Sequence, residues 1–553
     1  MQRPWLRHYE LGVPHTILLP NQPLHRYLER SASRYPQRTA LIFYGSKMSY
    51  EELERRANRF ANALIDLGVR QGDRAMILLP NTPQCVIAYY GALKAGAIVV
   101  LSNPLYAEGE LERQVRDCGS ETLITLSHFY PMARRVRERT GLKRTIVTHI
   151  ADYMTLHRRL LLTWTRHPKD GQRIDGRGDI GSYHFLDLLK GYPADAPALE
   201  IRPEDVAVIQ YTGGTTDLPK GIMLTHRNLV ANIVQMRHWI TDVREGREVF
   251  LAVLPFSHVY GMTACMNLAI SLGSALILLP TFVTREVLEH IRAYRPTLFP
   301  GVPTMYMAIN NHPGVRRFGL SSIRACVSGA APLPIEVQEA FEKLTRGKLV
   351  EGYGLTEASP VTHATPLNGL RKTGSIGIPL PSTEAKIVDL ESGAELPPGG
   401  IGELAVRGPQ VMLGYWNRPE ETREVLRDGW LYTGDIASLD EDGYFRIIDR
   451  KKDMIIAGRY NVYPRDVEEV LYEHPQVFEV AVVGIPPWDE NQVVKAYVVL
   501  KEGQKASAEE IIAFCRNRLE SHAVPQVVEF RRELPKTLVG KVLRRVLISS
   551  GSE

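Results

Sequence analysis

The sequence has few cysteines for its length, and they are widely spaced. Five occur among 553 residues, namely Cys85, Cys118, Cys265, Cys326 and Cys515. No two of them form a CxxC pair, so the common zinc motifs are excluded and a disulfide framework is not indicated. We therefore expect a reducing compartment, the cytoplasm.

The sequence also lacks a secretory signal and a strong excess of charge of either sign. Residues 1–20 contain no continuous apolar core followed by a small-residue cleavage site. Lys and Arg number 67 and Asp and Glu 62, a net charge of +5 that gives no argument for nucleic-acid binding. Hydrophobic residues make up 44% and charged residues 23%, which is ordinary for a globular protein.

One charge-free stretch, residues 261–280, is long enough to cross a bilayer. Asn267, Ser271, Gly273 and Ser274 interrupt it, and it divides into a helix-like half and the strand-like SALILL. This division is typical of a buried helix–strand unit. We expect the stretch to lie inside a folded domain.

Short apolar strands alternate with amphipathic helices in the first part of the chain. TALIF (39–43) and RAMILL (74–79) are predicted strands, and residues 50–67 between them are a predicted helix. This βαβ alternation is typical of α/β layers. Residues 374–414 are rich in Gly, Pro and short alternating strands, which indicates a β-rich subdomain.

The stretch QYTGGTTDLPKG, residues 210–221, is a candidate phosphate-binding loop. It follows an apolar run and precedes a helix predicted to begin near residue 226, so we expect a strand-to-helix loop. Its backbone N–H, hydroxyl and ammonium donors suit an anion. These donors belong to Thr212, Gly213, Gly214, Thr215, Thr216 and Lys220. The order Lys-Gly does not match the Gly-Lys-Ser/Thr of P-loop kinases and GTPases.

This loop resembles the signature loop of the AMP-forming, adenylate-forming enzymes, which include acyl-CoA synthetases, luciferases and peptide-synthetase adenylation domains. Gly213 stands where many members have serine, although long-chain fatty acyl-CoA ligases are similar in having glycine. Asp217 replaces a second glycine. A carboxylate there is expected to repel a triphosphate unless it points away or faces Mg²⁺.

Three further elements resemble the acyl and adenine regions of the same family. By this resemblance LPFSHVYG (254–261) places His258 at the carboxylate and acyl site. The alternative interpretation is a histidine with a purely structural role. FPGVPTMY (299–306) resembles the wall of the acyl tunnel. VSGAAPLP (327–334) resembles the loop at the adenine edge, where the small residues are Gly329, Ala330 and Ala331.

EGYGLTEAS, residues 351–359, resembles the family's nucleotide and metal element. The resemblance implies that Tyr353 stacks on adenine, that Thr356 lies on the phosphate side and that Glu357, with Thr212, binds Mg²⁺. One acid is enough, because Mg²⁺ is usually held by one or two carboxylates together with nucleotide oxygens and water. Glu351, Gly352 and Gly354 complete the implied nucleotide-binding element.

The C-terminal part contains four more residues that the resemblance singles out. Asp435, in YTGDIA, is implied to accept hydrogen bonds from both ribose hydroxyls. The alternative interpretation is that Asp435 caps a helix or turn. In DRKKDMIIAGRYNVYPRDVEE, Arg450 is implied at the ribose and Lys452 near the pivot of a hinge. Lys541, in PKTLVGKVLRR, matches the mobile catalytic lysine that reaches the substrate carboxylate and the α-phosphate.

The resemblance covers residues 27–545 and implies two domains. Residues 1–449 are the expected AMP- and acyl-binding domain, and residues 450–553 the expected mobile α+β domain. The implied reaction uses ATP and Mg²⁺ to convert a long-chain fatty acid to acyl-AMP and then uses CoA to give acyl-CoA, AMP and pyrophosphate. The expected catalytic residues are Thr212, His258, Glu357 and Lys541.

Two alternatives stay open at this point. Arg459 stands where glycine is usual, in a loop near the pantetheine of CoA, which favours a fatty acyl-AMP ligase that passes the acyl group to a carrier protein. Asp217 favours a non-catalytic nucleotide-binding paralogue.

The pattern weakens over residues 151–192, where MTLHRRLLLTWTRHPK interleaves Arg158, Arg159 and Arg166 with apolar residues. This composition suits an anionic membrane surface. We favour a partly buried linker helix, because no clear helical moment separates the two faces. Peripheral association with the inner face of the membrane and a homodimer are both compatible with the sequence.

Overall fold

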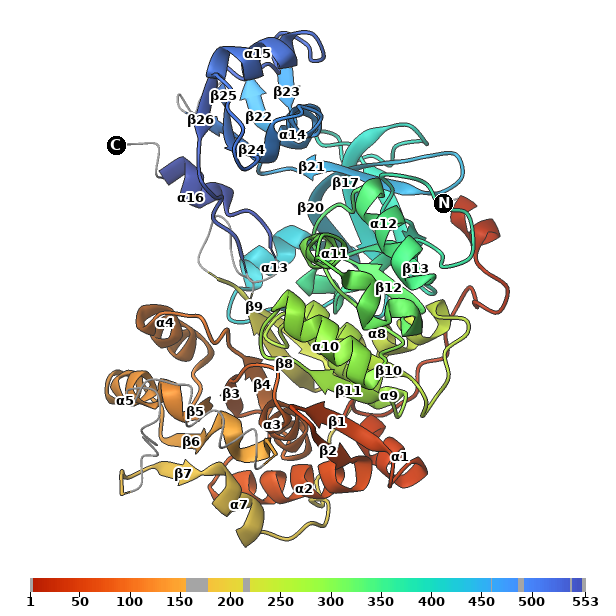
Figure 1. The fold of residues 1–553 in the computed structure, drawn as a ribbon. Coiled ribbons are helices and arrows are strands. Elements are labelled where there is room, and N and C mark those ends of the chain that lie inside the picture. The colour runs from red at the N-terminus through yellow and green to blue at the C-terminus, as the bar shows by residue number, and fades with distance from the viewer. Residues whose placement is uncertain are drawn as a thin grey trace.

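The computed structural model describes residues 3–155, 178–211, 219–458, 460–485, 492–537 and 540–549. Figure 1 shows a large body that runs from red to cyan and a small C-terminal domain in blue above it. The basic run at Arg158, Arg159 and Arg166 lies outside the described residues, so its two interpretations both stay predictions.

The first large sheet has the strand order β18-β9-β8-β4-β3-β5-β6-β7. The strands from β8 to β7 run parallel, whereas β9 and β18 run antiparallel to their neighbours. Their bounds are β3 (Arg74–Leu78), β4 (Ile98–Leu101), β5 (Thr122–Leu126), β6 (Arg144–Thr148), β7 (Ser182–His184), β8 (Val206–Tyr211), β9 (Gly221–Thr225) and β18 (Gly414–Tyr415).

Local signals explain where the helices beside this sheet begin and end. The Ser49 hydroxyl accepts a hydrogen bond of 3.2 Å from the backbone N–H of Glu52 and so caps α2 (Tyr50–Asp66). Gly119, with a φ of 62°, ends α4 (Glu108–Cys118) in the left-handed conformation. Other helices of this part are α1 (Arg26–Arg34), α3 (Pro83–Lys94), α5 (Tyr130–Arg139) and α7 (Phe185–Gly191).

The second large sheet continues the order β2-β1-β11-β10 through Leu298, which bridges Phe250 and Ala325, into β12-β13-β14-β15. Its strands are β1 (Thr39–Phe43), β2 (Ser46–Ser49), β10 (Val249–Ala252), β11 (Ala275–Leu278), β12 (Ala325–Ser328), β13 (Lys348–Gly354), β14 (Val361–Ala364) and β15 (Ile378–Pro379). The accompanying helices are α8 (His226–Trp239), α9 (Leu268–Ser271), α10 (Thr284–Tyr294), α11 (Pro303–Asn310) and α12 (Ile335–Thr345).

The charge-free stretch 261–280 forms a helix–strand unit, as expected. It begins with a π-helical segment (Gly261–Asn267), continues into α9 and then forms β11, and most of it is buried. Among the described residues, no helix combines the length and the apolar character needed to cross a bilayer.

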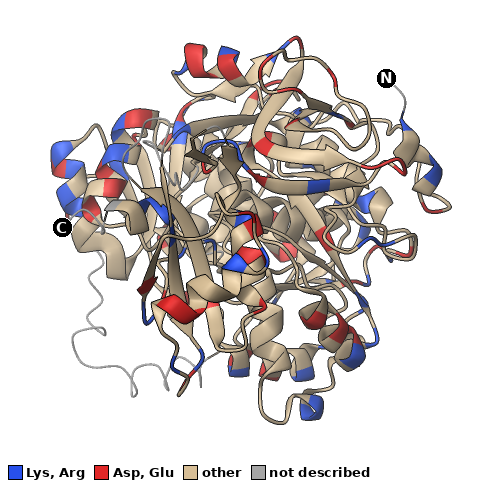
Figure 2. Cartoon of the chain, turned by 90° about the horizontal axis from the view of Figure 1, so that it is seen from above, with Lys and Arg blue, Asp and Glu red and all other residues tan. Residues whose placement is uncertain are grey.

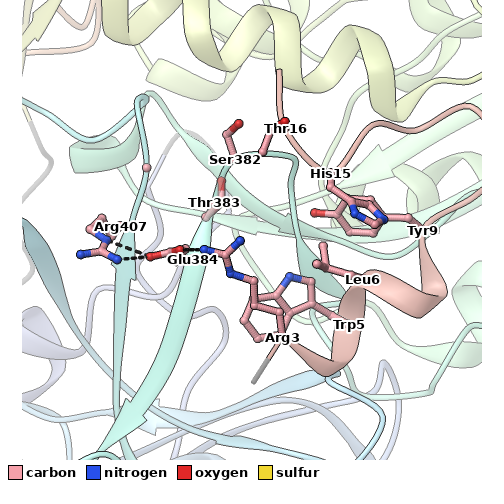
Figure 3. A pocket seen from close by; sticks show the side chains of 11 residues that line it. Arg3, Trp5, Leu6, Tyr9, His15, Thr16, Ser382, Thr383, Glu384 and Arg407 are labelled. Atoms are coloured by element: carbon pink, nitrogen blue, oxygen red, sulfur yellow. Dashed lines mark hydrogen bonds and ion pairs between the residues drawn. The ribbon is translucent and has the colours of Figure 1, made fainter. Parts of the chain in front are cut away.

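The β-rich subdomain consists of β16 (Glu384–Val388), β17 (Ile401–Arg407), β19 (Leu426–Arg427), β20 (Trp430–Leu439) and β21 (Phe445–Arg450), with α13 (Pro419–Val425) nearby. The N-terminal segment packs against it. Arg3 and Arg407 both pair with Glu384 beside a cavity of about 300 Å³ (Figure 3). Because both arginines are already paired with Glu384, the pocket favours a structural attachment of the N-terminus.

The small domain has its own sheets and core. Its elements are β22 (Ile455–Ala457), β23 (Tyr460–Val462), α14 (Pro464–Tyr472), β24 (Val477–Ile485), β25 (Val493–Leu500), α15 (Ala508–Arg516), β26 (Val527–Phe530) and α16 (Arg544–Ser549). The large core ends at Phe445 and the small core begins at Ile455. The predicted boundary between residues 449 and 450 falls between them and stays a prediction.

Acidic and basic residues are intermixed along the ribbon in Figure 2. Arg135 and Arg139 of α5, for example, pair with Glu108 of α4 at 2.8 and 3.0 Å. The arginine-rich helix α5 is thus partly neutralised by its neighbour.

All five cysteines are buried free thiols. Burial raises the pKa of Cys85 and Cys118 to about 12 and that of Cys515 to about 11. Since the thiolate is the reactive form, these side chains are chemically quiet at neutral pH.

The α/β fold class is confirmed, but one local expectation was wrong. The candidate loop does not lead directly into a helix, because Gly221–Thr225 forms β9, antiparallel to β8, and α8 begins only after Thr225. A helix N-terminus therefore does not directly follow the loop. The alternative interpretation of Asp435 as a helix or turn cap is excluded, because Asp435 lies within strand β20.

Candidate active site

The candidate phosphate loop is described only at its two ends. Its predicted donors Thr212, Gly213, Gly214, Thr215 and Thr216 lie outside the described residues, as do Asp217 and Arg459, so their roles stay predictions. Lys220, at the start of the return strand, is half-buried, and its ammonium lies 5.1 Å from the centre of the Tyr415 ring. This distance suits a cation–π contact.

Side-chain contacts at Asp117 and close packing at Gly221 hold the two strands at the base of this loop. Tyr211 ends β8 and donates a 2.5 Å hydrogen bond to Asp117 of α4. Arg418 pairs with the same carboxylate at 3.1 Å. A Cβ on Gly221 would lie 2.8 Å from the Ile209 side chain and 3.2 Å from the Tyr211 ring, so a side chain there would disturb the strand pair. The two described ends of the loop, Tyr211 and Gly221, are thus held in place by packing.

The predicted adenine element is one continuous strand end. Glu351, Gly352, Tyr353 and Gly354 occupy successive positions at the end of β13. A Cβ on Gly352 would lie 2.7 Å from the Val327 side chain, and one on Gly354 would lie 2.1 Å from the Pro360 carbonyl oxygen. Glycine is therefore required at both positions by close packing.

The second adenine element, Gly329, Ala330 and Ala331, forms the turn after β12, which pairs with β13 in parallel register. Ala330 has a φ of 67° and is exposed. A Cβ on Gly329 would approach the Tyr260 ring to 3.2 Å. The structure thus places both predicted adenine elements at neighbouring strand ends.

Glu351 carries an unusual carboxyl group beside these elements. Burial raises its pKa to about 7, and the backbone N–H of Leu333 and the charge of Arg465 oppose that rise. Leu333 donates to the Glu351 carboxylate at 3.3 Å. Arg465 belongs to α14, so the charge of a small-domain residue acts on this edge of the site.

Tyr353, Asp435 and Arg450 form a linked group from three strands. The Tyr353 hydroxyl donates to Asp435 at 2.5 Å, and Arg450 pairs with Asp435 at 3.5 Å. Register between β20 and β21 places Asp435 directly opposite Arg450. The structure therefore brings together the two residues that were predicted at the ribose and the tyrosine predicted at the adenine.

Glu357 lies in a short 3-10 turn (Thr356–Ala358) with Thr356 beside it. Burial raises the pKa of its carboxyl, while a 3.0 Å hydrogen bond from Tyr415 and the charge of Arg450 lower it. The described residues contain no cluster of three metal-ligating side chains around it. A single carboxylate fits a Mg²⁺ ion that is held mainly by nucleotide oxygens and water.

His258 of the large domain is influenced by the charge of Lys541 of the small domain. Burial, together with the Lys541 charge, lowers the pKa of His258 to about 4. The His258 Nδ1 accepts a 3.2 Å hydrogen bond from the backbone N–H of Tyr260, so the neutral ring carries its proton on Nε2. This arrangement leaves the Nε2–H of the neutral ring as a hydrogen-bond donor.

Lys541 lies among charged residues of the site. Burial lowers its pKa to about 7; Arg450 adds to this effect, whereas Asp435 and Asp453 oppose it. Its neighbour Gly540 has a φ of 78°, and a Cβ there would lie 3.2 Å from Thr304 at the start of α11. Gly540, next to Lys541, therefore lies against the large domain.

Arg544, three residues beyond Lys541, connects the chain near Lys541 to α14 and to the chain around β21. It pairs with Glu468 at 2.7 Å, Asp453 at 3.0 Å and Asp449 at 3.7 Å. Lys452, the predicted pivot, lies on the exposed turn after β21. The structure thus places it between the domains, but its role stays a prediction.

Sequence reasoning missed Tyr415, Asp117 and Arg544 as parts of this site. Arg544 stood inside the quoted PKTLVGKVLRR motif, so its charge was a usable signal. Tyr415 follows a Gly-rich stretch and Asp117 lies on an ordinary amphipathic helix, and neither carries a local signal of its partner.

Known proteins support the family that these elements suggested. The profile of the AMP-binding enzyme family matches residues 28–416, and that of the AMP-binding enzyme C-terminal domain matches residues 466–541. A long-chain-fatty-acid–CoA ligase of Bacillus subtilis is 49% identical, with 100% of this chain and 99% of the relative covered. A ligase of the same description from Escherichia coli O6:H1 is 39% identical, with 99% and 98% covered.

Solved structures agree with this match. ATP-bound MatB from Rhodopseudomonas palustris has a TM-score of 0.84 at 29% identity, with 97% of this chain and 99% of that chain covered. A fatty acyl CoA synthetase from Mycobacterium tuberculosis has a TM-score of 0.73 at 29% identity, with 96% and 98% covered.

Proposed function

The chain belongs to the AMP-binding enzyme family, and from this we propose that the protein is a long-chain fatty acid:CoA ligase. It uses ATP to convert the fatty acid to acyl-AMP and pyrophosphate. The CoA thiol then displaces AMP to give acyl-CoA. The observation that carries the proposal is the position of Lys541: its neighbour Gly540 lies against Thr304 of the large domain, and the charge of Asp435 acts on the lysine.

In the first step the residues act by position and charge, with no covalent enzyme intermediate. Lys541 and the neutral Nε2–H of His258 hold the fatty acid carboxylate against the α-phosphate. Asp435 and Arg450 hold the ribose, and the end of β13 holds the adenine. Lys220 and the preceding loop bind the phosphate oxygens.

Mg²⁺ fits the single carboxylate of Glu357, with Thr212 as its second proposed protein contact. When bound, the ion neutralises charge on the phosphate oxygens. Glu357 contributes by fixing the phosphates relative to Lys541. The Tyr415 hydroxyl and the Arg450 charge oppose the rise in the pKa of its carboxyl that burial causes.

In the second step we propose that the small domain turns at the segment around Lys452, so that Lys541 leaves and a CoA channel forms. The exposed turn after β21 supports this role. Arg459 belongs to this step, and we propose that its side chain turns outward to meet the CoA phosphates.

The test is to incubate the protein with ATP, Mg²⁺, CoA and a series of fatty acids of increasing chain length, and to measure AMP, pyrophosphate and acyl-CoA separately. We expect all three products, with a maximum among the long chains. Release of pyrophosphate without thioester, with thioester gained by Arg459→Gly, would instead identify a fatty acyl-AMP ligase. Absence of both pyrophosphate and acyl-AMP would overturn the proposal.

A further inference from the structure

The phenol of Tyr415 contacts both sides of the candidate phosphate site. Its hydroxyl donates a 3.0 Å hydrogen bond to the Glu357 carboxylate. Its ring face lies 5.1 Å from the Lys220 ammonium. Glu357 and Lys220 lie far apart in the sequence and on different elements, so one side chain connects the predicted metal ligand to a predicted phosphate ligand.

The backbone around Tyr415 is held to the same two elements. Tyr415 pairs with Ile222 in β9, and the N–H of Trp416 donates to the Gly221 carbonyl oxygen at 2.7 Å. On the other side, the N–H of Met412 donates to the Glu357 carbonyl oxygen at 2.8 Å. The segment 412–416 therefore spans from the strand after the phosphate loop to the turn that carries Glu357.

The side chain itself has little freedom to leave this position. Tyr415 is 8% exposed, and its backbone N–H donates to the Thr422 hydroxyl at 2.9 Å. A hydrogen bond between a fixed phenol and a carboxylate restricts the carboxylate to one orientation. A carboxylate that is already ordered loses less conformational entropy when it binds a cation.

We propose that Tyr415 is a positioning residue of the adenylation reaction, which aims the Glu357 carboxylate at the nucleotide-bound Mg²⁺ and fixes its distance from Lys220. This inference rests on the proposed function for its ligand, ATP with Mg²⁺. It adds a role that is carried by the hydroxyl and separable from the ring.

Two substitutions separate these roles. Tyr415→Phe keeps the ring beneath Lys220 and removes the hydrogen bond to Glu357. Tyr415→Leu removes both contacts. The matched control is Tyr444→Phe, because Tyr444 is also buried and its hydroxyl donates to the Leu370 carbonyl oxygen at 2.6 Å, away from Glu357 and Lys220.

The first measurement is equilibrium binding of ATP over a range of Mg²⁺ concentrations, without fatty acid or CoA. We expect Tyr415→Phe to raise the half-saturating Mg²⁺ concentration about tenfold, as for the loss of a hydrogen bond to a charged group. ATP affinity without Mg²⁺ should stay unchanged in Tyr415→Phe and fall in Tyr415→Leu. Tyr444→Phe should change neither quantity.

The outcomes distinguish this inference from the proposed function. If Tyr415→Phe lowers thermal stability as Tyr444→Phe does and leaves the Mg²⁺ dependence of ATP binding unchanged, Tyr415 is merely structural and the inference is overturned. If the wild type binds ATP with Mg²⁺ but makes no acyl-CoA, the proposed function fails while the binding result still decides the role of Tyr415.

Discussion

At the scale of single residues, Lys541 has a pKa lowered to about 7 because it is buried near Arg450. The charged form predominates below that pH and is lost as the pH rises through it. Because kcat/KM reports the free enzyme, we expect kcat/KM for ATP to fall above about pH 7. Lys541→Arg should abolish this fall, since a guanidinium stays charged.

The same residue gives a second measurement. Lys541→Ala should slow acyl-AMP formation by roughly two to three orders of magnitude, the usual effect of removing one charge-stabilising donor. Thioester formation from preformed acyl-AMP should change much less, because we propose that Lys541 has then moved away. An equal loss in both half-reactions would contradict two working conformations.

At the scale of elements, Asp117 is the point where α4, β8 and the segment after β18 meet. Asp117→Ala removes the partner of the Tyr211 hydroxyl and of Arg418, which should lower the free energy of unfolding by roughly 1–3 kcal/mol. Because Tyr211 directly precedes the phosphate loop, the KM for ATP should rise and the KM for fatty acid should not. Chemical denaturation and steady-state kinetics measure the two effects.

Glu112→Ala on the same helix is the control for Asp117. Glu112 pairs with Arg116 at 2.9 Å on the surface of α4, away from the loop. We expect a smaller change in stability and an unchanged KM for ATP. A similar rise in KM for both variants would show that α4 as a whole, and not Asp117, supports the loop.

Arg544 connects elements of the small domain in the way that Asp117 connects elements of the large domain. Arg544→Ala leaves Glu468, Asp449 and Asp453 without their shared cation, which should destabilise this domain by about 3–5 kcal/mol, as for one partner removed from a buried ion pair. Hydrogen exchange in α14 and β24 measures this loss. The exposed Arg516 of α15 is the control, since Arg516→Ala should leave exchange unchanged.

Elements with a complete local signal were predictable from the sequence. TALIF coincides with β1, and the helix predicted over 50–67 differs from α2 by one residue, because a short apolar run marks the strand and a helical pattern with a serine cap marks the helix. The strand Gly221–Thr225 was missed because it is short and runs straight into α8. Its signal was Thr225, whose hydroxyl accepts a 3.1 Å hydrogen bond from the Asn228 N–H.

The site was predictable only where a motif carries it. Glu357, Asp435 and Lys541 were found by resemblance, and the structure places them in one charged group. Periodicity and spacing hold no information on which distant side chain completes such a group. The Tyr415–Glu357 and Asp117–Tyr211 hydrogen bonds follow from the packing of the sheets, and that packing becomes visible only in three dimensions.

At the scale of the whole molecule, the contact between Gly540 and Thr304 joins the small domain to the large one. Gly540→Ala adds a methyl group 3.2 Å from the Thr304 hydroxyl at a φ of 78°, so the loop must shift away from the large domain. We expect acyl-AMP formation to fall about tenfold, the effect of about 1.4 kcal/mol. Thioester formation from preformed acyl-AMP should stay near the wild-type rate.

Gly503→Ala is the matched control for this prediction. Gly503 also has a positive φ, 77°, but a Cβ there meets nothing within 4 Å. It therefore carries the same backbone strain in the same domain without the contact. If both variants slow acyl-AMP formation equally, the effect comes from strain in the small domain and not from its contact with Thr304.

The burial of all five thiols makes the native chain ready for site-specific labelling. Maleimide dyes should react with it slowly, so no cysteine needs to be removed. Cysteines introduced at the exposed Arg26 of α1 and Arg516 of α15 would carry a donor and an acceptor fluorophore at opposite ends of the molecule (Figure 1). Energy transfer between them would then follow the small domain in real time as each substrate is added.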